Sequence, residues 1–182
     1  SVRQVSYGDC FEEALGIDPH TEKLTILQSL AEEKGYLQWG NETRANCLDL
    51  LFSELVEPHL SQGLVTVYDY PACQAALAQT YRDKKGRLVS RRFEVFLNNT
   101  ELANGYFELT NAREQLQRFQ QDNDLRQQAN QPIIPIDVKL DKAMQQGLPS
   151  CSGVALGVDR LLMQLANRHA VSEVIPFSWD RC

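Results

Sequence analysis

The spacing between apolar residues changes along the chain, and this change limits the folds open to it. In the first third, apolar residues recur at helical spacing in two stretches, within residues 24–31 and 48–56. Between residues 64 and 109 they follow the alternation of strands. Helical spacing then returns on both sides of one last apolar run at 153–158. Helices that flank a block of antiparallel strands predict a single α+β domain.

Capping residues give the expected starts of three helices. Asp18 is expected to cap a helix whose first residue is Pro19. Asn111 and Glu114 resemble a capping box, with the Asn111 side chain on the backbone of the first turn. Asp137 is placed to cap a further helix. The helical segments before residue 60 are expected to form core rather than a cofactor site.

A tight hairpin is expected in the middle of the chain, where two strand-like segments flank Asn98 and Asn99. With a two-residue loop, residue 97 opposes 100, residue 96 opposes 101 and residue 94 opposes 103. Side chains alternate along a strand, so Glu94 and Glu101 are expected to share one face. Two such carboxylates repel unless something positive lies between them. A magnesium ion that also binds phosphate would satisfy both. The alternatives are a solvent-exposed sheet face, or pairing with Arg91 or Arg92.

Three further polar residues follow in the second hairpin strand. Asn104, Tyr106 and Glu108 have the opposite parity from Glu101, so one shared pocket requires a break in the alternation. We expect a β-bulge at Asn104 and Gly105, because both residues tolerate positive φ. Glu108 would then offer a carboxylate to an ammonium group, Asn104 a polar contact and Tyr106 an aromatic wall. Core packing is the alternative for Tyr106.

The run from Gly153 to Arg160 combines two glycines, an apolar strand pattern and a terminal Asp-Arg pair. Glycine within a strand often marks the close approach of a ligand or another backbone. Arginine in the first turn of a helix, beside free backbone donors, suits an anion such as phosphate. A buried strand that leads into a core helix, with Arg160 in an ordinary salt bridge, fits the pattern equally well.

Composition excludes several classes of protein. The 182 residues carry a net charge of −6, which makes a large tRNA or DNA groove a poor expectation. No apolar run approaches the ~20 residues that span a bilayer. Five cysteines are scattered and odd in number, which argues for reduced thiols in a cytoplasmic protein and against a disulfide framework or a zinc site.

Together these motifs resemble a known family. The run from Gly153 to Arg160, followed by Leu-Leu-Met, resembles the third signature motif of class II aminoacyl-tRNA synthetases. Segments 92–96 and 101–109 and the helix after them resemble the lysyl-tRNA synthetase branch. Segments 69–74, 149–153 and 173–178 are most similar to a stand-alone group of that branch, the elongation factor P–(R)-β-lysine ligases.

The resemblance implies a six-stranded antiparallel sheet flanked by helices, with ATP and substrate lying across it. Glu94 and Glu101 would hold Mg²⁺ and the ATP phosphates, and Asn104, Tyr106 and Glu108 would line a lysine pocket. Gly153 and Gly157 would lie under the nucleotide, with Arg160 as the catalytic arginine on the γ-phosphate. Ala155 stands where lysyl-tRNA synthetases usually have glycine, which favours (R)-β-lysine over α-lysine.

The implied reaction forms an aminoacyl-adenylate from ATP and lysine or (R)-β-lysine, and then transfers the acyl group to a lysine of elongation factor P. A lysyl-tRNA synthetase that charges tRNA is one alternative, and a non-catalytic binding module is another. The first and second signature motifs are not found. Residues 1–182 therefore resemble the C-terminal portion of a catalytic domain, expected to be inactive alone and to come from a homodimeric parent enzyme.

Overall fold

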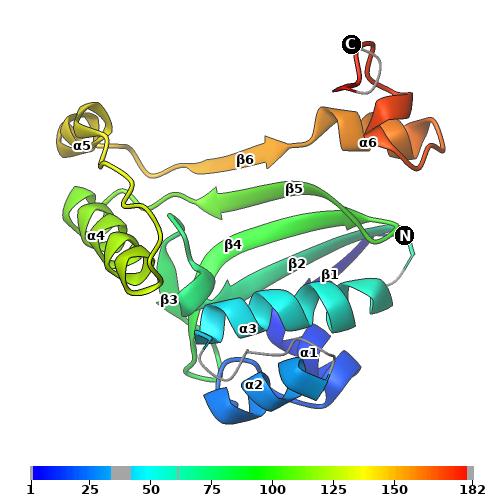
Figure 1. Ribbon diagram of the computed structural model, residues 1–182, viewed down its shortest axis with the longest axis horizontal. Helices are drawn as coiled ribbons and strands as arrows, with labels where there is room; N and C mark the ends of the chain where they lie inside the picture. The colour runs from blue at the N-terminus through cyan, green and yellow to red at the C-terminus, as the bar shows by residue number, and fades with distance from the viewer. Residues whose placement is uncertain (1, 34–41, 61, 180–182) are drawn as a thin grey trace.

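The computed structural model describes residues 2–33, 42–60 and 62–179, which form one twisted sheet with helices around it (Figure 1). Five strands follow the order β1-β2-β4-β5-β6, and β3 adds to β4. The strands are β1 (Val2–Ser6), β2 (Leu64–Pro71), β3 (Thr80–Arg82), β4 (Leu88–Leu97), β5 (Thr100–Phe107) and β6 (Ser152–Leu156). The predicted α+β class is confirmed. The expected antiparallel sheet needs one correction, because β1 pairs with β2 in parallel.

The helices fall into two groups along the chain. The first group holds α1 (Tyr7–Leu15), α2 (Leu24–Glu33) and α3 (Arg44–Leu51), which a π-helical turn at Phe52–Val56 and a 3-10 turn at Glu57–His59 prolong. The second group holds α4 (Ala112–Gln128), α5 (Val138–Gln145) and α6 (Val158–Leu165). Shorter 3-10 turns lie at Ala72–Gln74 and Val171–Glu173.

The capping predictions are confirmed for the second group and wrong for the first. Asn111 accepts a hydrogen bond from the backbone of Glu114, and Asp137 caps α5. Asp18 instead accepts from the backbone N–H of His20 in a turn, and the helix begins at Leu24. Asparagine and aspartate bond their own backbone two residues on, so the same chemistry serves a turn as well as a cap. The chain from residue 2 was expected to be helical, and β1 was missed.

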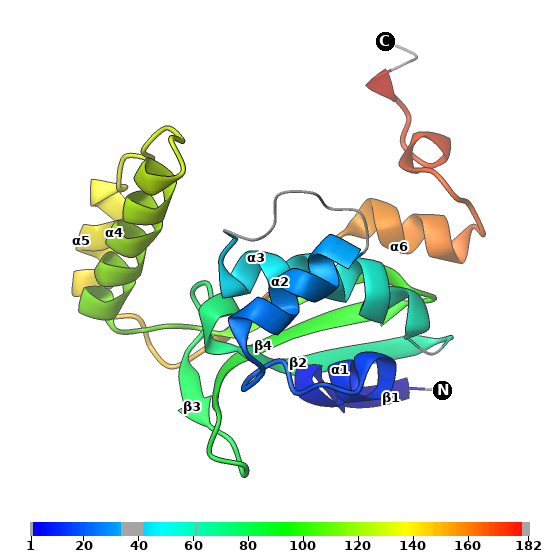
Figure 2. The same cartoon turned by 60° about the horizontal axis from the view of Figure 1, so that its bottom comes forward.

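The core lies where the first group of helices covers one face of β1, β2 and β4 (Figure 2). Tyr7 of α1 is fully buried, and its ring centroid lies 4.9 Å from that of Phe11 and 4.7 Å from that of Tyr70 on β2. The helical stretch 48–56, predicted as core, supplies Leu48, Leu51 and Phe52. Burying large aromatic side chains of this kind contributes about 1.5–3 kcal/mol each.

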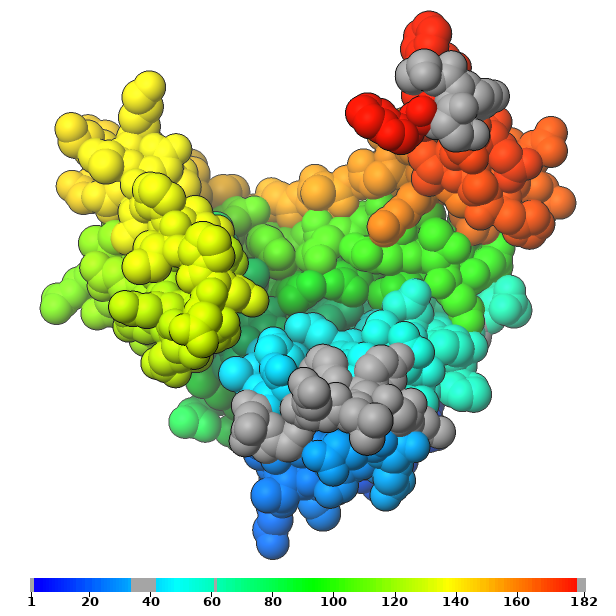
Figure 3. All heavy atoms as spheres, in the orientation of Figure 1, coloured from blue at the N-terminus to red at the C-terminus, as the bar shows by residue number. Residues whose placement is uncertain are grey.

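The other end of the sheet is open. Among the described strands, β6 pairs with β5 alone, and α6 has no buried residue. Large apolar side chains are exposed here, among them Val154, Leu156, Val158 and Leu165. The strand and helix expected at Gly153–Arg160 are therefore present, but they are not buried. The surface is hollowed between the α4–α5 pair and the segment after α6, with β6 along the hollow (Figure 3).

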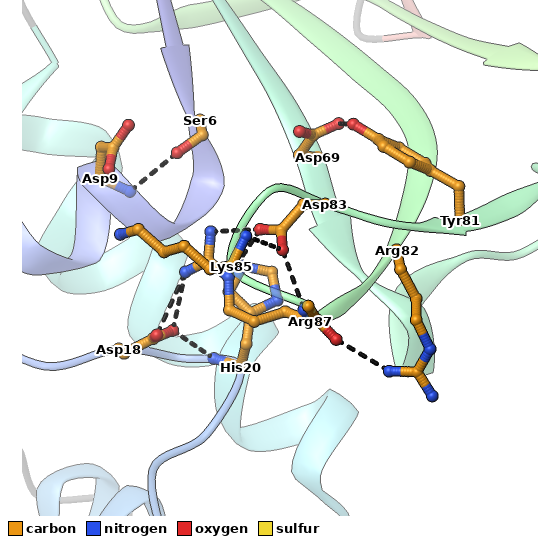
Figure 4. A network of polar contacts seen from close by, with 11 residues as sticks. Ser6, Asp9, Asp18, His20, Asp69, Tyr81, Arg82, Asp83, Lys85 and Arg87 are labelled. Carbon is orange, nitrogen blue, oxygen red and sulfur yellow. Dashed lines mark hydrogen bonds and ion pairs between the residues drawn. The ribbon is translucent and has the colours of Figure 1, made fainter.

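A salt-bridge network ties the β3–β4 turn to the segment between α1 and α2 (Figure 4). Arg87 pairs with Asp83 at 2.7 Å and with Asp18 at 3.1 Å. Hydrogen bonds outweigh burial and lower the pKa of both carboxyls: the His20 backbone N–H and then Arg87 act on Asp18, and Arg87 acts on Asp83. Both ring nitrogens of His20 are buried beside this network without a hydrogen-bond partner among the described residues. Burial, assisted by the Arg87 charge, lowers the pKa of His20 to about 4.

The buried neutral His20 predicts a loss of stability in mild acid. The unfolded histidine takes up a proton near pH 6.5, whereas the folded one resists until about pH 4. Across that window the unfolded state binds more protons, so the free energy of unfolding should fall as pH falls, by about 1–3 kcal/mol after allowing for partial exposure.

Denaturant unfolding of the wild type and His20→Gln at several pH values measures this effect. The glutamine does not titrate, so other groups shift both proteins alike. The difference in unfolding free energy between the two should move by this amount from pH 7 to pH 4. Parallel pH profiles would show that His20 is not buried as a neutral ring.

Candidate functional site

The predicted site residues meet on one face of β4, β5 and β6. Two rows of cross-strand partners cross these strands: Glu94, Asn104 and Ala155 form one, and Arg92, Tyr106 and Gly153 form the other. Paired residues in a sheet point to the same face. Glu101 opposes Phe96, two residues along β4 from Glu94, and therefore shares that face.

A β-bulge brings these residues together, although not where it was predicted. Residues 97 and 96 oppose 100 and 101 as expected, but the register then shifts and Val95 opposes Ala103. The extra residue is Leu102, and consequently Glu94 opposes Asn104 rather than residue 103. The prediction of a bulge at Asn104 and Gly105 was wrong. A Cβ on Gly105 would lie 2.4 Å from the Phe93 ring, so close packing explains that glycine.

The Glu94 carboxylate is the best-connected group of the site and is 8% exposed. Its Oε1 accepts hydrogen bonds from Arg92 Nη2 at 2.5 Å and from Asn104 Nδ2 at 2.8 Å. Its Oε2 accepts a bond from the Tyr70 hydroxyl at 2.7 Å. Pairing with Arg92 is one of the alternatives that the sequence left open for Glu94, and a solvent-exposed position, another of them, is wrong for Glu94. A buried carboxylate needs such donors, because an unpaired charge is costly to bury.

Arg92 and Tyr70 are held in turn by their neighbours. The Arg92 guanidinium carbon lies 4.7 Å from the centroid of the Tyr70 ring, and its Nη1 donates to the backbone oxygen of Gln74. Burial lowers the pKa of Arg92, but the Glu94 charge, together with Tyr70, Tyr106 and the hydrogen bond to Glu94, raises it by more, so the net shift is upward. Burial and Glu94 together raise the pKa of Tyr70 well above its usual range. Arg92 therefore stays charged and Tyr70 stays protonated as a donor.

Arg160 contacts Glu101 across the sheet. Its Nη1 lies 3.0 Å from the Glu101 backbone oxygen and 3.2 Å from Glu101 Oε2, with both side chains partly exposed. Gly157 caps α6, and its N–H donates to the Leu102 backbone oxygen at 2.8 Å. The bulge residue thus anchors the start of the helix that carries Arg160. A partly exposed pair of this kind is worth little in stability, so Arg160 is free to exchange partners at low cost.

Glu108 lies at the far end of the same face, against Gly153. A Cβ on Gly153 would lie 2.4 Å from Glu108 Oε1, so only glycine fits there without moving the carboxylate. The backbone of Glu108 is fixed on both sides: its N–H donates to Cys151, and its oxygen accepts from Gln79 Nε2. Within the described chain, no hydrogen bond reaches the Glu108 carboxylate itself. The site thus presents one unpaired carboxylate beside the row that ends in Gly153.

Sequence reasoning missed several residues around Glu94. Tyr70 and Gln74 were named only as part of segment 69–74, and Asp49 was given no role. Gln74 Nε2 donates to Asp49 Oδ1 at 2.6 Å, and burial raises the pKa of Asp49 while this bond opposes the rise. A register shift between Tyr68 and Tyr70 turns Tyr70 toward the core, whereas the strict alternation that buries Val65 and Val67 would have pointed it to the other face. No pattern in the sequence predicts that Asp49 on α3 contacts Gln74.

Three further findings concern metal ligands, membrane-spanning helices and cysteines in the described chain. Among residues 2–33, 42–60 and 62–179, no three His, Cys, Asp or Glu side chains group as they would around a metal ion held by protein alone. In the same residues, no helix has the length and apolar character needed to cross a bilayer. Cys10, Cys47, Cys73 and Cys151 form no disulfide among the described residues, and Cys182 lies outside them.

The sequence is similar to those of known proteins, and their family has the class that the motifs resemble. The family model of the class II tRNA synthetases specific for Asp, Lys and Asn matches residues 1–181. Over 98% of this chain, the sequence is 46% identical to that of a protein of Pseudoalteromonas translucida. Over 99% of this chain, it is 41% identical to that of a protein of Haemophilus ducreyi. Both carry the name elongation factor P–(R)-β-lysine ligase, and the chain spans 55% of each.

A third relative with that name, from Salmonella paratyphi B, is 44% identical over 99% of this chain. This chain spans 56% of the length of that relative. The chain therefore spans about half the length of these relatives. The family match extends over nearly the whole sequence. The chain belongs to the class II aminoacyl-tRNA synthetase family, in its Asp, Lys and Asn group.

Proposed function

We propose that this chain is the C-terminal portion of a ligase catalytic domain that activates (R)-β-lysine, or lysine, with ATP. The whole enzyme then transfers the acyl group from the adenylate to a lysine side chain of elongation factor P, in the cytoplasm. The observation that carries this proposal is the position of Ala155. Its backbone opposes Asn104, in the row that begins with Glu94, within a chain whose relatives are named as such ligases.

The methyl group of Ala155 would narrow the lysine pocket. Glycine at this point leaves room for an amino group on the α-carbon, whereas alanine favours a substrate whose amino group is displaced by one carbon. One methyl group in a tight pocket discriminates by about 1–3 kcal/mol. Glu108 supports the same reading, because its carboxylate is available to an ammonium group at the other end of the face.

The residues present suit Mg²⁺ and ATP. Magnesium in such enzymes is held by one or two carboxylates together with substrate phosphates, so a larger acidic cluster is not required. Glu94 and Glu101 supply carboxylate oxygens, and the buried Asn104 Oδ1 has no partner among the described residues. The ion, when bound, would neutralise charge on the phosphates. Glu94 and Glu101 would hold it.

The remaining steps rest on positioning by side chains of this chain. Arg160 can leave Glu101 for a γ-phosphate oxygen without breaking a buried contact. Gly153 keeps the surface flat, so that nucleotide and substrate lie close to the backbone. Holding the carboxylate of the substrate against the α-phosphate in this way is the main contribution expected, because oriented reactants can account for about 7–11 kcal/mol of a barrier.

The open end of the sheet suits a partial catalytic domain. The free edge of β6 and the exposed apolar residues of α6 are surfaces that a folded enzyme covers. We expect the part of the relatives that this chain does not span to cover them, and to supply the remaining ATP contacts. A parent homodimer is also expected from the family.

The proposal is tested with the whole protein that contains these residues. ATP–pyrophosphate exchange should be stimulated by (R)-β-lysine more than by α-lysine, and mass spectrometry should find the acyl group on one lysine of elongation factor P. The 182-residue chain alone should show no exchange, which serves as the matched control. Preference for α-lysine with acylation of tRNA would identify a lysyl-tRNA synthetase instead.

Ala155→Gly in the whole protein tests the selectivity argument. Removing the methyl group should improve kcat/KM for α-lysine about tenfold or more, with a smaller change for (R)-β-lysine. Val154→Gly is the control, because it gives β6 the same backbone freedom while Val154 pairs with Gly105 on the opposite face. Equal effects of the two substitutions on the ratio of kcat/KM values would remove Ala155 from the specificity of the site.

A further inference from the structure

The Glu108 carboxylate is carried by a residue that lies just beyond the end of a strand. Glu108 follows Phe107, the last residue of β5, so individual contacts place its backbone. Its N–H donates to the Cys151 oxygen at 3.0 Å, and its own oxygen accepts from Gln79 Nε2 at 3.0 Å. The carboxylate lies against Gly153. Its direction therefore depends on segments outside the β4–β5–β6 ladder.

Residues 77–79 support the Glu108 backbone from a neighbouring stretch of chain. Ala78 and Glu108 form an isolated antiparallel bridge. Two backbone hydrogen bonds flank this bridge and join residues 77 and 79 to the residues on either side of Glu108: Leu109 to Leu77 at 2.8 Å, and Gln79 to Phe107 at 2.9 Å. A shift of this segment would move the Glu108 backbone with it.

The segment begins with a backbone conformation that alanine does not favour. Ala76 has a φ of +46°, in the left-handed region, which costs energy for any residue that carries a Cβ. Such a conformation persists only where surrounding contacts impose it. Residues 76–79 therefore need a contact that holds them in this shape.

Arg118 of α4 provides that contact. Its Nη1 donates to the backbone oxygens of Ala76 at 2.6 Å and Ala78 at 2.8 Å, so one nitrogen bridges both sides of Leu77. Its Nη2 donates to the Glu114 carboxylate at 2.6 Å, one turn earlier on α4. A planar guanidinium held by a carboxylate presents its other donors in a fixed direction. Arg118 thus fastens the support of Glu108 to a long helix.

We propose that Arg118 is a positioning residue, which holds residues 76–78 and thereby fixes the Glu108 carboxylate for the terminal ammonium group of the amino-acid substrate. The terminal group is the one concerned, because Glu108 and Ala155 lie at opposite ends of the site face and Ala155 is assigned to the other amino group. Arg118 acts through the backbone and needs no contact with the substrate. This inference rests on the proposed function, since it explains how that site holds its amino-group ligand.

The test measures kcat/KM for ATP–pyrophosphate exchange by the whole protein, with (R)-β-lysine and with 3-aminohexanoic acid, which lacks the terminal amino group. Arg118→Met keeps an unbranched apolar stem and removes every donor. It should lower kcat/KM for (R)-β-lysine about tenfold or more, and leave kcat/KM for the analogue and the KM for ATP unchanged. Equal losses for the two substrates would show general damage to the fold and would overturn the inference.

Arg126→Met is the matched control on the same helix. Arg126 Nε also donates to a backbone oxygen, that of Pro132 in the segment between α4 and α5. This variant therefore loses a bond of the same kind without touching residues 76–78, and the ratio of the two kcat/KM values should stay at its wild-type level. A change equal to that of Arg118→Met would show that the effect does not come through residues 76–78.

A double-mutant cycle tests whether Arg118 acts through Glu108. Glu108→Gln removes the charge that recognises the ammonium group, so adding Arg118→Met should lower kcat/KM for (R)-β-lysine little further. Losses that multiply would show two independent effects and would contradict the proposal. If Arg118→Met does not fold, Arg118→Lys takes its place in the same cycle, because it keeps a charged donor for one of the two oxygens.

The outcomes separate this inference from the proposed function. Multiplying losses, in a protein whose exchange (R)-β-lysine still stimulates, overturn the role of Arg118 and leave the proposed function standing. A wild-type protein in which neither (R)-β-lysine nor α-lysine stimulates exchange contradicts both.

Discussion

The buried Glu94 carboxylate is the interaction on which the arrangement of the site depends. A charge removed from water requires several donors at once, and here they come from three strands: Tyr70 from β2, Arg92 from β4 and Asn104 from β5. Each donor is thereby fixed in direction. Losing one partner of a buried ion pair typically costs about 3–5 kcal/mol, so these side chains are held firmly before any ligand arrives.

The same network connects the core to the candidate site. Tyr70 packs against Tyr7 under the first group of helices, and its hydroxyl reaches Glu94. From Glu94 the row continues through Asn104 to Ala155 at the uncovered end of the sheet. Helices of the first group therefore cover the sheet at β1, β2 and β4, whereas no described element covers it at β6 and α6. We propose that the substrate binds at the boundary between these two parts of the sheet.

Local patterns predicted much of the fold because their causes are local. The Asn98–Asn99 turn, with positive φ at both residues, and the caps at Asn111 and Asp137 follow from short-range chemistry. The parallel pairing of β1 depends on β2, which lies about sixty residues away, and no neighbouring residue signals it. The position of the bulge was predicted wrongly for a similar reason. The backbone oxygen of the bulge residue Leu102 accepts a hydrogen bond from Gly157, which lies in a distant segment of the sequence.

The grouping of site residues was predicted better than their partners. Glu94, Glu101, Asn104, Tyr106 and Glu108 were expected together, and the bulge puts their strands in the register that allows it. Their roles toward metal and nucleotide stay predictions. Gln74 and Asp49 could not be found from sequence, because only the packing of α3 against the turn after β2 brings them together.

Strands β4 and β5 form a stable floor of the candidate site, and α6 lies at an edge that the rest of the described chain does not cover. Backbone hydrogen–deuterium exchange of the 182-residue chain distinguishes the two regions. We expect slow exchange for the β4 and β5 amides that bond one another, and exchange close to that of an unfolded peptide for α6. Equal protection of α6 and β4 would contradict it, because the edge would then be complete without any further chain.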